Sequence, residues 1–567
     1  LKTDSANIIL DLMSGIYNFD EKNVWTFVRI ENDTLVTGYR QTQGWARTRT
    51  VYFALTFSKP IKEYGQKKYD KQVYRGFWRK FDESKNFPEM AGRQIRAYFQ
   101  FDTEENEEIK LKFALSSVST EGALRNLKAE IPHWDFNKIR KEGEDEWNNE
   151  LAKIQIESLT PSDKETFYTA LYHSFLSPIE YMDIDGAYKG LDGNIHQAEG
   201  FTNYTIFSLW DTYRALHPLF NLIQPSRNKD MMESLLAHFD QSVHPMLPVW
   251  SHYANENWCM IGYHSVSALA DAMAKNVLDP KSYKRALKAS VQSAKTSYYD
   301  GIGDYMKYGY VPDDKNSYAV SKTLEYAYDD WCIAQMADHV GDQETNEEFT
   351  KRALSYRNVF RKDKGSMAPK LENGEWRNEF DKLSTHGQGF IEGNAWNYSL
   401  YVPHHPEQMI KLMGGKNAFE YHLDSLFTEH LDDSYFANTE DITRDGIIGL
   451  YVHGNEPGHH IPFLYNWTNA PWKTQSRVRM ILNTMYSNTN DGLCGNDDAG
   501  QMSAWYVFNA LGFYPVAPGS NKYSIGSPLV KSAMISFENG NQLQIKVINQ
   551  KAENVYIQQL KINGVDI

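Results

Sequence analysis

The sequence predicts an α+β protein of several domains, in which a β-sandwich precedes a ring of paired helices and a few strands follow it. Three observations lead to this fold class. Short apolar or alternating runs fill the first part of the chain, helical periodicity fills the middle, and strand-like runs return at the end. The length of 567 residues is too great for one ordinary domain. The expected division is a β-sandwich domain at 1–128, a helical linker at 129–160, a helical domain at 161–520 and C-terminal strands at 521–567.

The first region separates short apolar runs by charged and glycine-containing loops, which is typical of a sandwich. Strands are expected at 7–13, 25–30, 48–57, 94–101 and 109–116. The segment from Ala129 to Leu159 carries many charges and is expected to form a helix that links two domains. The chain begins within an apolar run and ends without a natural stop, so we expect both ends of the native protein, and any signal peptide, to lie outside this sequence.

The third region shows helical periodicity with long connecting loops. Helices are expected at 164–176, 208–222, 230–241, 262–275, 280–294, 321–339, 344–361, 406–413, 474–486 and 501–511. This number of helices with long loops argues against a simple bundle and suits a toroid of paired helices, an α/α barrel, whose loops at one rim would hold the site. Strands are expected again at 533–537, 542–548 and 554–562.

Composition narrows the class of protein. The net charge of −14 opposes nucleic-acid binding and fits a soluble protein that acts on a neutral or cationic small ligand. No run of about 18 apolar residues predicts a membrane span. Aromatic residues make up 14% of the chain, and most are expected in the core, although aromatic faces also stack on sugar rings. The three cysteines form neither a metal cluster nor a disulfide framework, while one disulfide remains open.

The segment CGNDDAGQMSAWY, residues 494–506, gathers carboxylates directly before an expected helix. Asp498 and Gln501 form a D-x-x-Q pattern, in which the Asp would accept from free amides of the first turn and the Gln would reach back to an amide. A cap needs one carboxylate, however, and Asp497 adds a second like charge beside it. A helix cap and a catalytic carboxylate therefore both remain open for Asp498.

Two further segments combine carboxylates with aromatic residues. In SLWDTYRALHP, Asp211 and Arg214 follow Trp210 at a spacing that places both on one helix face, where an ordinary ion pair is the simpler interpretation. In GFIEGNAWNYS, Glu392 lies among apolar neighbours and close to Trp396. Apolar surroundings raise the pKa of a carboxyl group and suit it to general acid catalysis, whereas the alternative is a Glu hydrogen-bonded in a turn.

The segment YVHGNEPGHHIPFLYNW invites a metal hypothesis through His453, Glu456, His459 and His460. A zinc protease motif would need H-E-x-x-H on a helix, but glycine and proline make this segment a loop. Asn455 and Glu456 offer hard oxygen ligands instead, which favours calcium over zinc. The histidines could equally be structural and bonded to backbone groups.

Glycoside hydrolysis needs a protonated acid and a second carboxylate on the other side of the sugar ring. Separated acidic loops, one beside aromatic residues and one among polar groups, are typical of such sites. Together these segments resemble glycoside hydrolase family 92, the calcium-dependent exo-acting α-mannosidases. The resemblance rests on SLWDTYRALHP (208–218), MIGYHSVSALADA (260–272), KTLEYAYDDWCIA (322–334), EGNAWNYS (392–399), GNEPGHHIPFLYNW (454–467), APWKTQ (470–475) and GNDDAGQMSAWYVFNALGFYPVAPGS (495–520).

The resemblance implies a β-sandwich joined to an (α/α)6 barrel and hydrolysis with inversion at the anomeric carbon. It implies that Glu392 is the general acid and Asp498 the general base. Some members carry a further Asp two residues before the base, where this chain has Asn496, so Asp497 is a second candidate for that role.

The resemblance also implies a calcium cofactor with Asn455 and Glu456 as ligands, and contacts of Trp210 and Asp211 to the terminal mannose. The expected substrate-binding residues are Trp210, Asp211, Arg214, Trp396 and His453. The expected activity is release of terminal α-linked mannose, with α-1,2 linkages favoured, from N-glycans, mannans or other mannose-containing oligosaccharides, in a secreted, periplasmic or cell-surface bacterial protein. The alternatives are a non-catalytic mannan-binding protein of a glycan-uptake system and a different α/α-barrel glycosidase.

Overall fold

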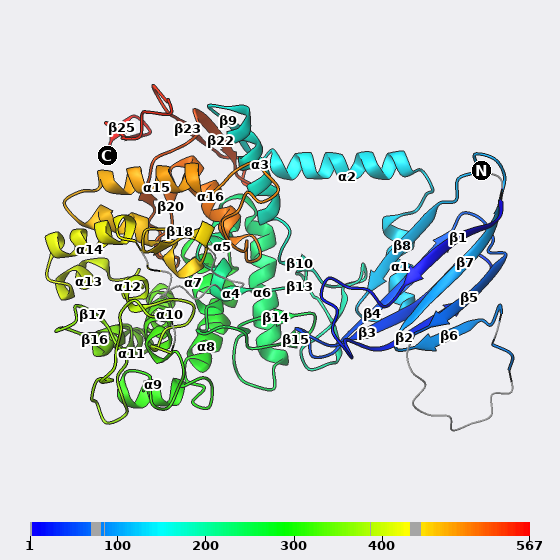
Figure 1. Ribbon diagram of the computed structural model, residues 1–567, viewed down its shortest axis with the longest axis horizontal. Coiled ribbons are helices and arrows are strands. Elements are labelled where there is room, and N and C mark those ends of the chain that lie inside the picture. The colour runs from blue at the N-terminus through cyan, green and yellow to red at the C-terminus, as the bar shows by residue number, and fades with distance from the viewer. Residues whose placement is uncertain (1–2, 70–80, 84, 386, 431, 433–443) are drawn as a thin grey trace. The chain divides into compact units, whose positions relative to one another are not determined.

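The computed structural model describes residues 3–69, 81–83, 85–385, 387–430, 432 and 444–567 (Figure 1). The chain divides into two compact units. The first comprises Leu1–Trp147, Glu180–Thr205 and Ser251–Asn257, and the second comprises Asn148–Ile179, Ile206–Trp250 and Trp258–Ile567. The predicted fold class is confirmed, because a β-sheet domain precedes a helical domain and strands return at the end. The arrangement of the helices as an (α/α)6 barrel stays a prediction.

The first unit contains two antiparallel sheets that form a sandwich. One sheet has the strand order β1-β7-β5 and the other β6-β2-β3-β4-β8. Alternate residues of β7, from Ile95 to Phe101, are buried, and they pack against Val28 and Phe57 of the second sheet. The strands are β1 (Thr3–Asp11), β2 (Asn23–Ile30), β3 (Leu35–Thr42), β4 (Arg49–Phe57), β5 (Glu63–Lys68), β6 (Glu89–Gly92), β7 (Ile95–Thr103) and β8 (Leu111–Ser116). The sequence did not predict β3, β5 or β6.

Helix α1 (Thr120–Glu130) covers the outer face of β4 and β8 through a small apolar cluster that includes Ala54 and Ala123. A later segment of the chain joins the same unit. Asp183 accepts hydrogen bonds from Ser116 Oγ at 2.8 Å and from Asn126 Nδ2 at 3.0 Å. Contacts between positions this far apart leave no local signal, so the sequence placed this segment in the helical domain.

The predicted linker helix is only partly right. Helix α2 (Phe136–Leu151) has no buried residue, as its charge pattern indicated. The expectation that helix continues through Leu159 is wrong, because β9 (Ile154–Glu157) is a strand that pairs with β22 (Ser532–Ser536). Its pairing partner lies far away in sequence, so no local pattern revealed it.

Strand β22 also pairs with β23 (Gln542–Lys546), which confirms two of the expected C-terminal strands. The third, at 554–562, is wrong, because only its last two residues form a strand, β24 (Lys561–Ile562), which pairs with β25 (Val565–Asp566). The remaining strands are two or three residues long: β10 (Ile179–Glu180), β11 (Ala187–Lys189), β12 (Ile195–Gln197), β13 (Tyr204–Thr205), β14 (Ser251–His252), β15 (Asn255–Glu256), β16 (Phe360–Arg361), β17 (Ser366–Met367), β18 (Ile447–Ile448), β19 (Tyr451–Val452), β20 (Phe513–Tyr514) and β21 (Ser524–Ile525).

Each of the predicted helices has a counterpart in the second unit. The expected helix at 208–222 is split in two. Three described α-helices of this unit were not predicted: the short α9 and α12, and α14, whose apolar residues recur at helical spacing. The helices are α3 (Pro161–Ser174), α4 (Leu209–Thr212), α5 (Leu216–Ile223), α6 (Pro225–Gln241), α7 (Ser265–Ala274), α8 (Tyr283–Ser293), α9 (Ile302–Tyr308), α10 (Ala319–Val340), α11 (Gln343–Arg352), α12 (Ala395–Tyr398), α13 (Pro406–Leu412), α14 (Lys416–Thr428), α15 (Trp472–Thr484) and α16 (Gln501–Leu511).

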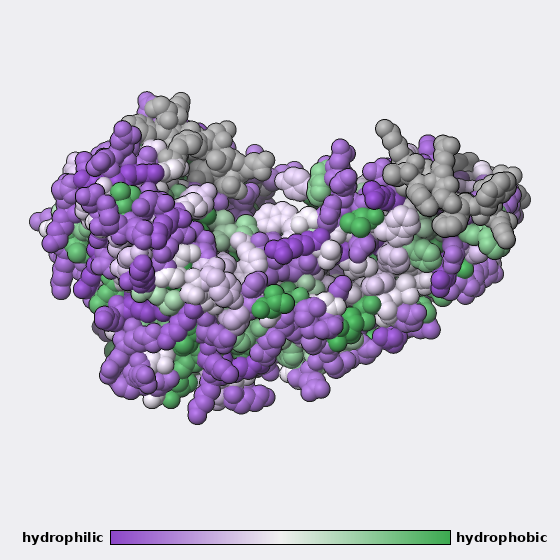
Figure 2. Space-filling model, turned by 90° about the horizontal axis from the view of Figure 1, so that it is seen from below, coloured by the Kyte–Doolittle hydropathy of each residue, from purple (hydrophilic) through white to green (hydrophobic). Residues whose placement is uncertain are grey.

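Two of these helices are buried on nearly all sides. Every residue of α16 is buried, and α10 is buried along most of its length although it carries several charged residues. Among the described residues, no helix is both long enough and apolar enough to cross a membrane. The face seen in Figure 2 is mostly hydrophilic, with hydrophobic residues scattered over it.

Candidate active site

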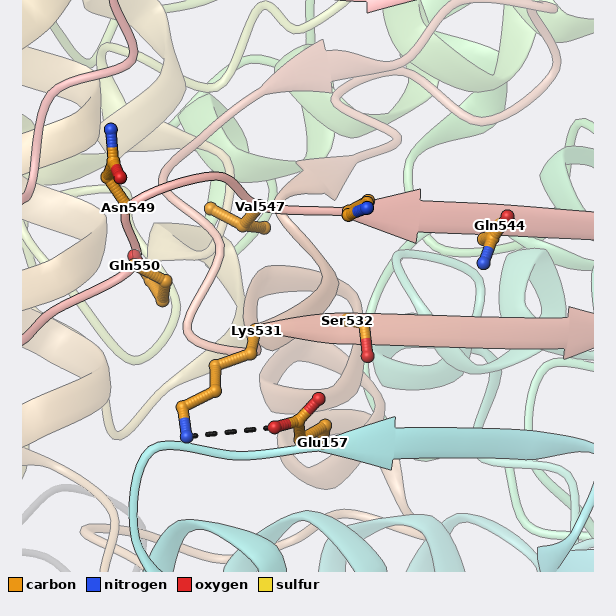
Figure 3. Close-up of a pocket in the computed structure, with 8 residues that line it drawn as sticks. Glu157, Lys531, Ser532, Gln544, Val547, Asn549 and Gln550 are labelled. Carbon is orange, nitrogen blue, oxygen red and sulfur yellow. Dashed lines mark ion pairs between the residues drawn. The ribbon is translucent and has the colours of Figure 1, made fainter.

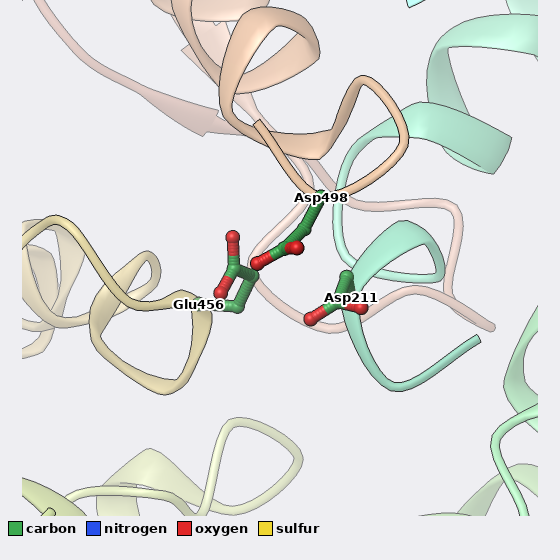
Figure 4. Close-up of side chains that lie close together, drawn as sticks. All are labelled: Asp211, Glu456 and Asp498. Carbon is green, nitrogen blue, oxygen red and sulfur yellow. The ribbon is translucent and has the colours of Figure 1, made fainter. Parts of the chain in front are cut away.

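Three carboxylates from distant parts of the sequence meet in the helical unit (Figure 4). Carboxylate oxygens of Asp211, Glu456 and Asp498 all lie within 4.8 Å of one another. Asp211 and Glu456 are 1% and 0% exposed, and Asp498 is half-buried. We call these residues the acidic trio. Like charges at this spacing and burial are costly unless a proton or a cation offsets them.

Two glycine-containing loops touch and thereby bring Glu456 to Asp498. A Cβ atom added at Gly495 would lie 2.4 Å from the carbonyl oxygen of Gly454, and one added at Gly454 would lie 2.8 Å from the carbonyl oxygen of Cys494. Only glycine permits such a close approach of two backbones. The glycines of the GNEP and CGNDD segments therefore have a geometric role in building the trio.

Asp497, three residues before the N-cap residue Gly500, is a carboxylate that bonds the first turn of α16. Asp497 Oδ1 accepts a hydrogen bond from the backbone N–H of Ser503 at 2.9 Å, in the first turn of α16. Gln501 does not reach back to the chain before the helix, because its Oε1 accepts from the N–H of Ala215 at 2.8 Å. The Gln501 half of the predicted D-x-x-Q pattern is wrong, and the Asp498 side chain is directed to the trio (Figure 4).

Burial and like charge set the electrostatics of the trio. Burial, and then the charge of Asp498, hold the pKa of Asp211 well above its usual range. Burial, followed by the charges of Asp498 and Asp211, does the same to the pKa of Glu456. Three buried oxygens have no hydrogen-bond partner within the described part of the chain: Oε1 and Oε2 of Glu456, and Oδ1 of Asp211. Buried carboxylate oxygens without donors are the ligands that a hard divalent cation such as calcium prefers.

Glu392 lies within electrostatic range of the trio, because its charge contributes to the raised pKa of Asp211. Its backbone adopts the left-handed region, with φ of 43°. Asn455 holds it there, since Asn455 Nδ2 donates to the Glu392 carbonyl oxygen at 3.1 Å and to Glu392 Oε2 at 3.2 Å. The expectation that Asn455 is a calcium ligand stays a prediction, and the carboxylates that lie closest to Glu456 in this site are those of Asp211 and Asp498.

Trp210 and Arg214 form a buried wall next to Asp211. The Arg214 guanidinium carbon lies 5.2 Å from the Trp210 ring centroid and 4.8 Å from that of Tyr213. Its Nε donates to the Trp210 carbonyl oxygen at 2.9 Å. Among the described ion pairs none joins Asp211 to Arg214, so the simple ion-pair interpretation is wrong. Both residues stay candidates for substrate binding.

The histidines around the GNEP segment are buried and bond other groups of the protein interior. The ring nitrogens of His453 lie 2.9 Å from the Tyr451 hydroxyl and 2.8 Å from the Tyr486 hydroxyl. His459 Nε2 lies 3.1 Å from the His453 carbonyl oxygen, and burial lowers the pKa of His459 to about 3. The structural alternative for these histidines fits the geometry, whereas a direct contact of His453 with substrate would need its tyrosine partners to move.

Trp396 lines a separate cavity. Its ring lies 4.5 Å from that of His422, and its indole nitrogen is buried without a hydrogen-bond partner in the described structure. The cavity has a volume of about 380 Å³ and is lined by Lys364, Phe380, Asp381, Lys382, Leu383, Trp396, Glu429 and Leu450. No member of the acidic trio is among these residues, and a contact of Trp396 with substrate stays a prediction.

A larger cavity, of about 470 Å³, lies over the sheet formed by β9, β22 and β23 (Figure 3). Lys531 Nζ and Glu157 Oε1 form an ion pair there at 3.7 Å, and amide side chains such as Gln544 complete the lining. Nothing in this cavity resembles the paired acids that hydrolysis needs, so the acidic trio remains the candidate active site.

Sequence reasoning missed the charged residues that lie behind the site. Glu325, Asp329 and His264 are each at most 1% exposed, and Glu325 accepts a hydrogen bond from the Trp210 indole. A signal was present, because Glu325 and Asp329 stand four residues apart in a helix that is otherwise rich in apolar and aromatic residues. Charges at such positions are seldom buried without a partner or a function.

Paired acids in a helical domain that follows a β-sandwich fit the class of glycoside hydrolases, which use two carboxylates. The chain belongs to glycosyl hydrolase family 92: residues 1–116 match the N-terminal domain of that family and residues 122–567 match its catalytic domain. This confirms the resemblance seen in the sequence.

Solved structures agree with this assignment. A family GH92 alpha-mannosidase from Bacteroides thetaiotaomicron is 43% identical, with a TM-score of 0.92 over 100% of this chain and 73% of that chain. The complex of that enzyme with mannoimidazole gives a TM-score of 0.93. A family GH92 inverting mannosidase from B. thetaiotaomicron VPI-5482 is 32% identical, with a TM-score of 0.86 over 99% and 75%.

A curated fungal relative, an uncharacterized secreted glycosidase from Arthroderma benhamiae, is 26% identical over 513 residues. The match covers 82% of this chain and 59% of the fungal protein, so the chain spans little more than half of that relative's length.

Removing one charge from the acidic trio is expected to stabilise the metal-free protein. Folding raises the pKa of Asp211 and of Glu456. The free energy of unfolding of the protein therefore falls as pH rises from the unfolded pKa of such a group, near 4, towards its folded pKa. In EDTA, Asp211→Asn should therefore gain about 2 kcal/mol in the free energy of unfolding at pH 8 and little at pH 4. Urea unfolding at both pH values measures this.

Asp497→Asn is the matched control, since its side chain bonds α16 outside the trio. Asn keeps the oxygen that accepts from the Ser503 N–H, so this variant should change stability at pH 8 by much less than Asp211→Asn does. A metal-free Asp211→Asn protein less stable than wild type at pH 8 would show that the three charges do not repel one another as described.

Proposed function

We propose that the protein is an exo-acting α-mannosidase that removes terminal α-linked mannose, with inversion, from N-glycans or mannans. The observation that carries the proposal is the buried acidic trio within electrostatic range of Glu392. Its support is the 43% identity to an alpha-mannosidase that was solved with mannoimidazole, and the 32% identity to an enzyme described as an inverting mannosidase. A location outside the cytoplasm is part of the proposal, and the fungal relative described as secreted supports it.

Glu392 and Asp498 divide the proton transfers. Glu392 gives its proton to the glycosidic oxygen as the bond from that oxygen to C1 breaks. A water molecule attacks C1 from the opposite face, and Asp498 takes the proton that this water loses. Asp497 is less suited to be the base, because its Oδ1 already accepts the Ser503 N–H. The donation of Asn455 Nδ2 to Glu392 keeps the acid oriented.

Calcium is the proposed cofactor, and the residues present fit it. Glu456 and Asp211 would hold the ion through buried oxygens that have no donor in the described structure, with Asp498 beside them. Asn455 would add a further ligand through its amide oxygen, because its Nδ2 is the atom that donates to Glu392. When bound, calcium would offset the crowded negative charge and polarise sugar hydroxyls. Trp210 and Arg214, in the wall next to Asp211, would contact the terminal mannose.

Removal of calcium is expected to abolish activity reversibly. After EDTA treatment, mannose release should fall by at least about 100-fold, because the trio would again hold mutually repelling carboxylates in the substrate site. Adding calcium back should restore it, whereas the same excess of magnesium should restore much less, since magnesium demands a stricter octahedral site. The measurement is mannose release from defined α-1,2-, α-1,3-, α-1,4- and α-1,6-mannobioses, with α-1,2 expected to be fastest.

The same panel separates the alternatives. Binding of mannobiose without any release of mannose would indicate a mannan-binding protein of a glycan-uptake system. Release of another sugar from a matched set of aryl glycosides, without release of mannose, would indicate a different glycosidase. Activity unchanged by EDTA would remove calcium from the proposal and leave the hydrolase assignment in place.

A further inference from the structure

A charged cluster is buried behind the wall that carries Asp211. His264 immediately precedes α7 and faces two carboxylates of α10. Its Nδ1 lies 2.8 Å from Asp329 Oδ1, and its Nε2 lies 2.8 Å from Glu325 Oε2. The side chains of Glu325 and Asp329 are 0% exposed, and that of His264 is 1% exposed. We call His264, Glu325 and Asp329 the α10 clamp.

The α10 clamp holds its imidazole as a cation. Each ring nitrogen faces a carboxylate oxygen, and only the doubly protonated ring can donate at both positions. Burial alone would lower the pKa of His264, but the charges and hydrogen bonds of Asp329 and Glu325 outweigh burial and raise it to about 9. The positive ring therefore lies between two buried carboxyl groups and bonds both of them.

Glu325 connects the α10 clamp to the active site. Its second oxygen, Oε1, accepts a hydrogen bond from Trp210 Nε1 at 3.1 Å and another from the Tyr398 hydroxyl. Trp210 directly precedes Asp211 on α4. The Glu325 carboxylate therefore bonds His264 through one oxygen and holds Trp210, the neighbour of Asp211, through the other.

Helix α4 depends on such outside contacts. It has only four residues, and a single helical turn is not stable alone. The residue that precedes it, Ser208, makes no side-chain cap to its backbone. The α10 clamp contacts this segment at two points. Glu325 bonds Trp210 within α4, and the ring of Tyr213, directly after α4, stacks on the His264 ring with centroids 4.5 Å apart and planes at 17°.

We propose that His264 is a positioning residue of the active site. By holding Glu325, it keeps the Trp210 indole in place, and Trp210 in turn keeps the Asp211 carboxylate at the acidic trio. His264 itself contacts no member of the trio in any described hydrogen bond, so it acts through Trp210. Partners behind a metal-binding carboxylate commonly change metal affinity or activity by 10–100-fold. The activity readouts of this inference rest on the proposed function.

The test compares His264→Gln with a neighbouring buried ion pair. Asp330 follows Asp329 on α10, and its Oδ2 accepts from Arg352 Nε at 3.0 Å, but the described partners of this pair do not include Trp210. Arg352→Gln is therefore the matched control for lost stability. Calorimetric titration of the EDTA-stripped proteins with calcium alone should show roughly tenfold weaker binding in His264→Gln, with a raised KM for an aryl α-mannoside. Arg352→Gln should melt at a lower temperature and keep both values.

A folded His264→Gln protein with wild-type calcium affinity, wild-type KM and an unmoved Asp211 carboxylate in its crystal structure would overturn the proposal. If that variant does not fold, Trp210→Phe replaces it, because it removes the indole N–H that reaches Glu325 and keeps an aromatic ring at this position. Trp210 is itself a proposed substrate contact, so the readout for this variant is calcium affinity alone, and unchanged calcium affinity in Trp210→Phe would equally overturn the proposal.

The outcomes distinguish this inference from the proposed function. If wild type binds no calcium, the metal assignment fails, and KM together with the Asp211 position in His264→Gln decides the role of the α10 clamp. If wild type cleaves no mannoside, the proposed function fails, and the crystal structure of the variant alone decides, with a displaced Asp211 as the expected result.

Discussion

Replacing Glu392 by Gln is expected to reduce cleavage of mannosides with poor leaving groups by roughly 10³-fold, because the departing sugar oxygen then receives no proton. An aryl mannoside whose leaving group is stable as an anion needs no such proton, so its cleavage should fall by less than about tenfold. Steady-state kinetics on an α-mannobiose and on a dinitrophenyl α-mannoside provides the two numbers.

The control for this variant is calcium affinity. Gln keeps the size of the Glu392 side chain, and its amide oxygen can still accept from Asn455 Nδ2, so the neighbouring Glu456 loop should keep its place. Calcium binding should therefore stay within about twofold of wild type. Equal losses on both substrates would contradict the assignment of Glu392 as the acid.

Replacing Asp498 by Asn is expected to reduce cleavage of both substrates by roughly 10³-fold or more, because water activation is needed whatever the leaving group. The pattern across leaving groups therefore differs from that of Glu392→Gln. Weaker calcium binding should accompany the loss, since Asp498 belongs to the acidic trio. The same kinetic assays and a calcium titration measure both effects.

Asp497→Asn separates the two adjacent carboxylates. Asn keeps the oxygen that accepts from the Ser503 N–H, so the variant should stay within about 1 kcal/mol of wild-type stability and lose less than about tenfold of activity. A larger loss of activity in Asp497→Asn than in Asp498→Asn would move the base to Asp497 and contradict the division of roles between cap and base.

The candidate site shows what local sequence patterns can reach. Carboxylates beside glycine or aromatic residues pointed to Asp211, Glu392, Glu456 and Asp498, and the structure brings the first, third and last of these within 4.8 Å. The pattern did not show that Asp211 belongs with Glu456, because contacts between distant loops depend on backbone approaches such as that of Gly454 to Gly495.

The errors have the same origin. A D-x-x-Q pattern suggested a capping box at Asp498, but Gln501 bonds the backbone at Ala215, far away in the sequence. The local pattern predicts helix where β9 forms, because the strand that pairs with β9 is β22, near the other end of the chain. Long periodic helices such as α10 and α16 were predicted well, since their burial leaves a strong local pattern.

Proton NMR of the sugar released from an aryl α-mannoside by the calcium-loaded protein tests the central claim most directly. An inverting enzyme with Glu392 as acid and Asp498 as base delivers water to the face opposite the leaving group. The account predicts that β-mannose appears first and that the α anomer follows only by mutarotation. Appearance of α-mannose first, or no release of mannose, would contradict it.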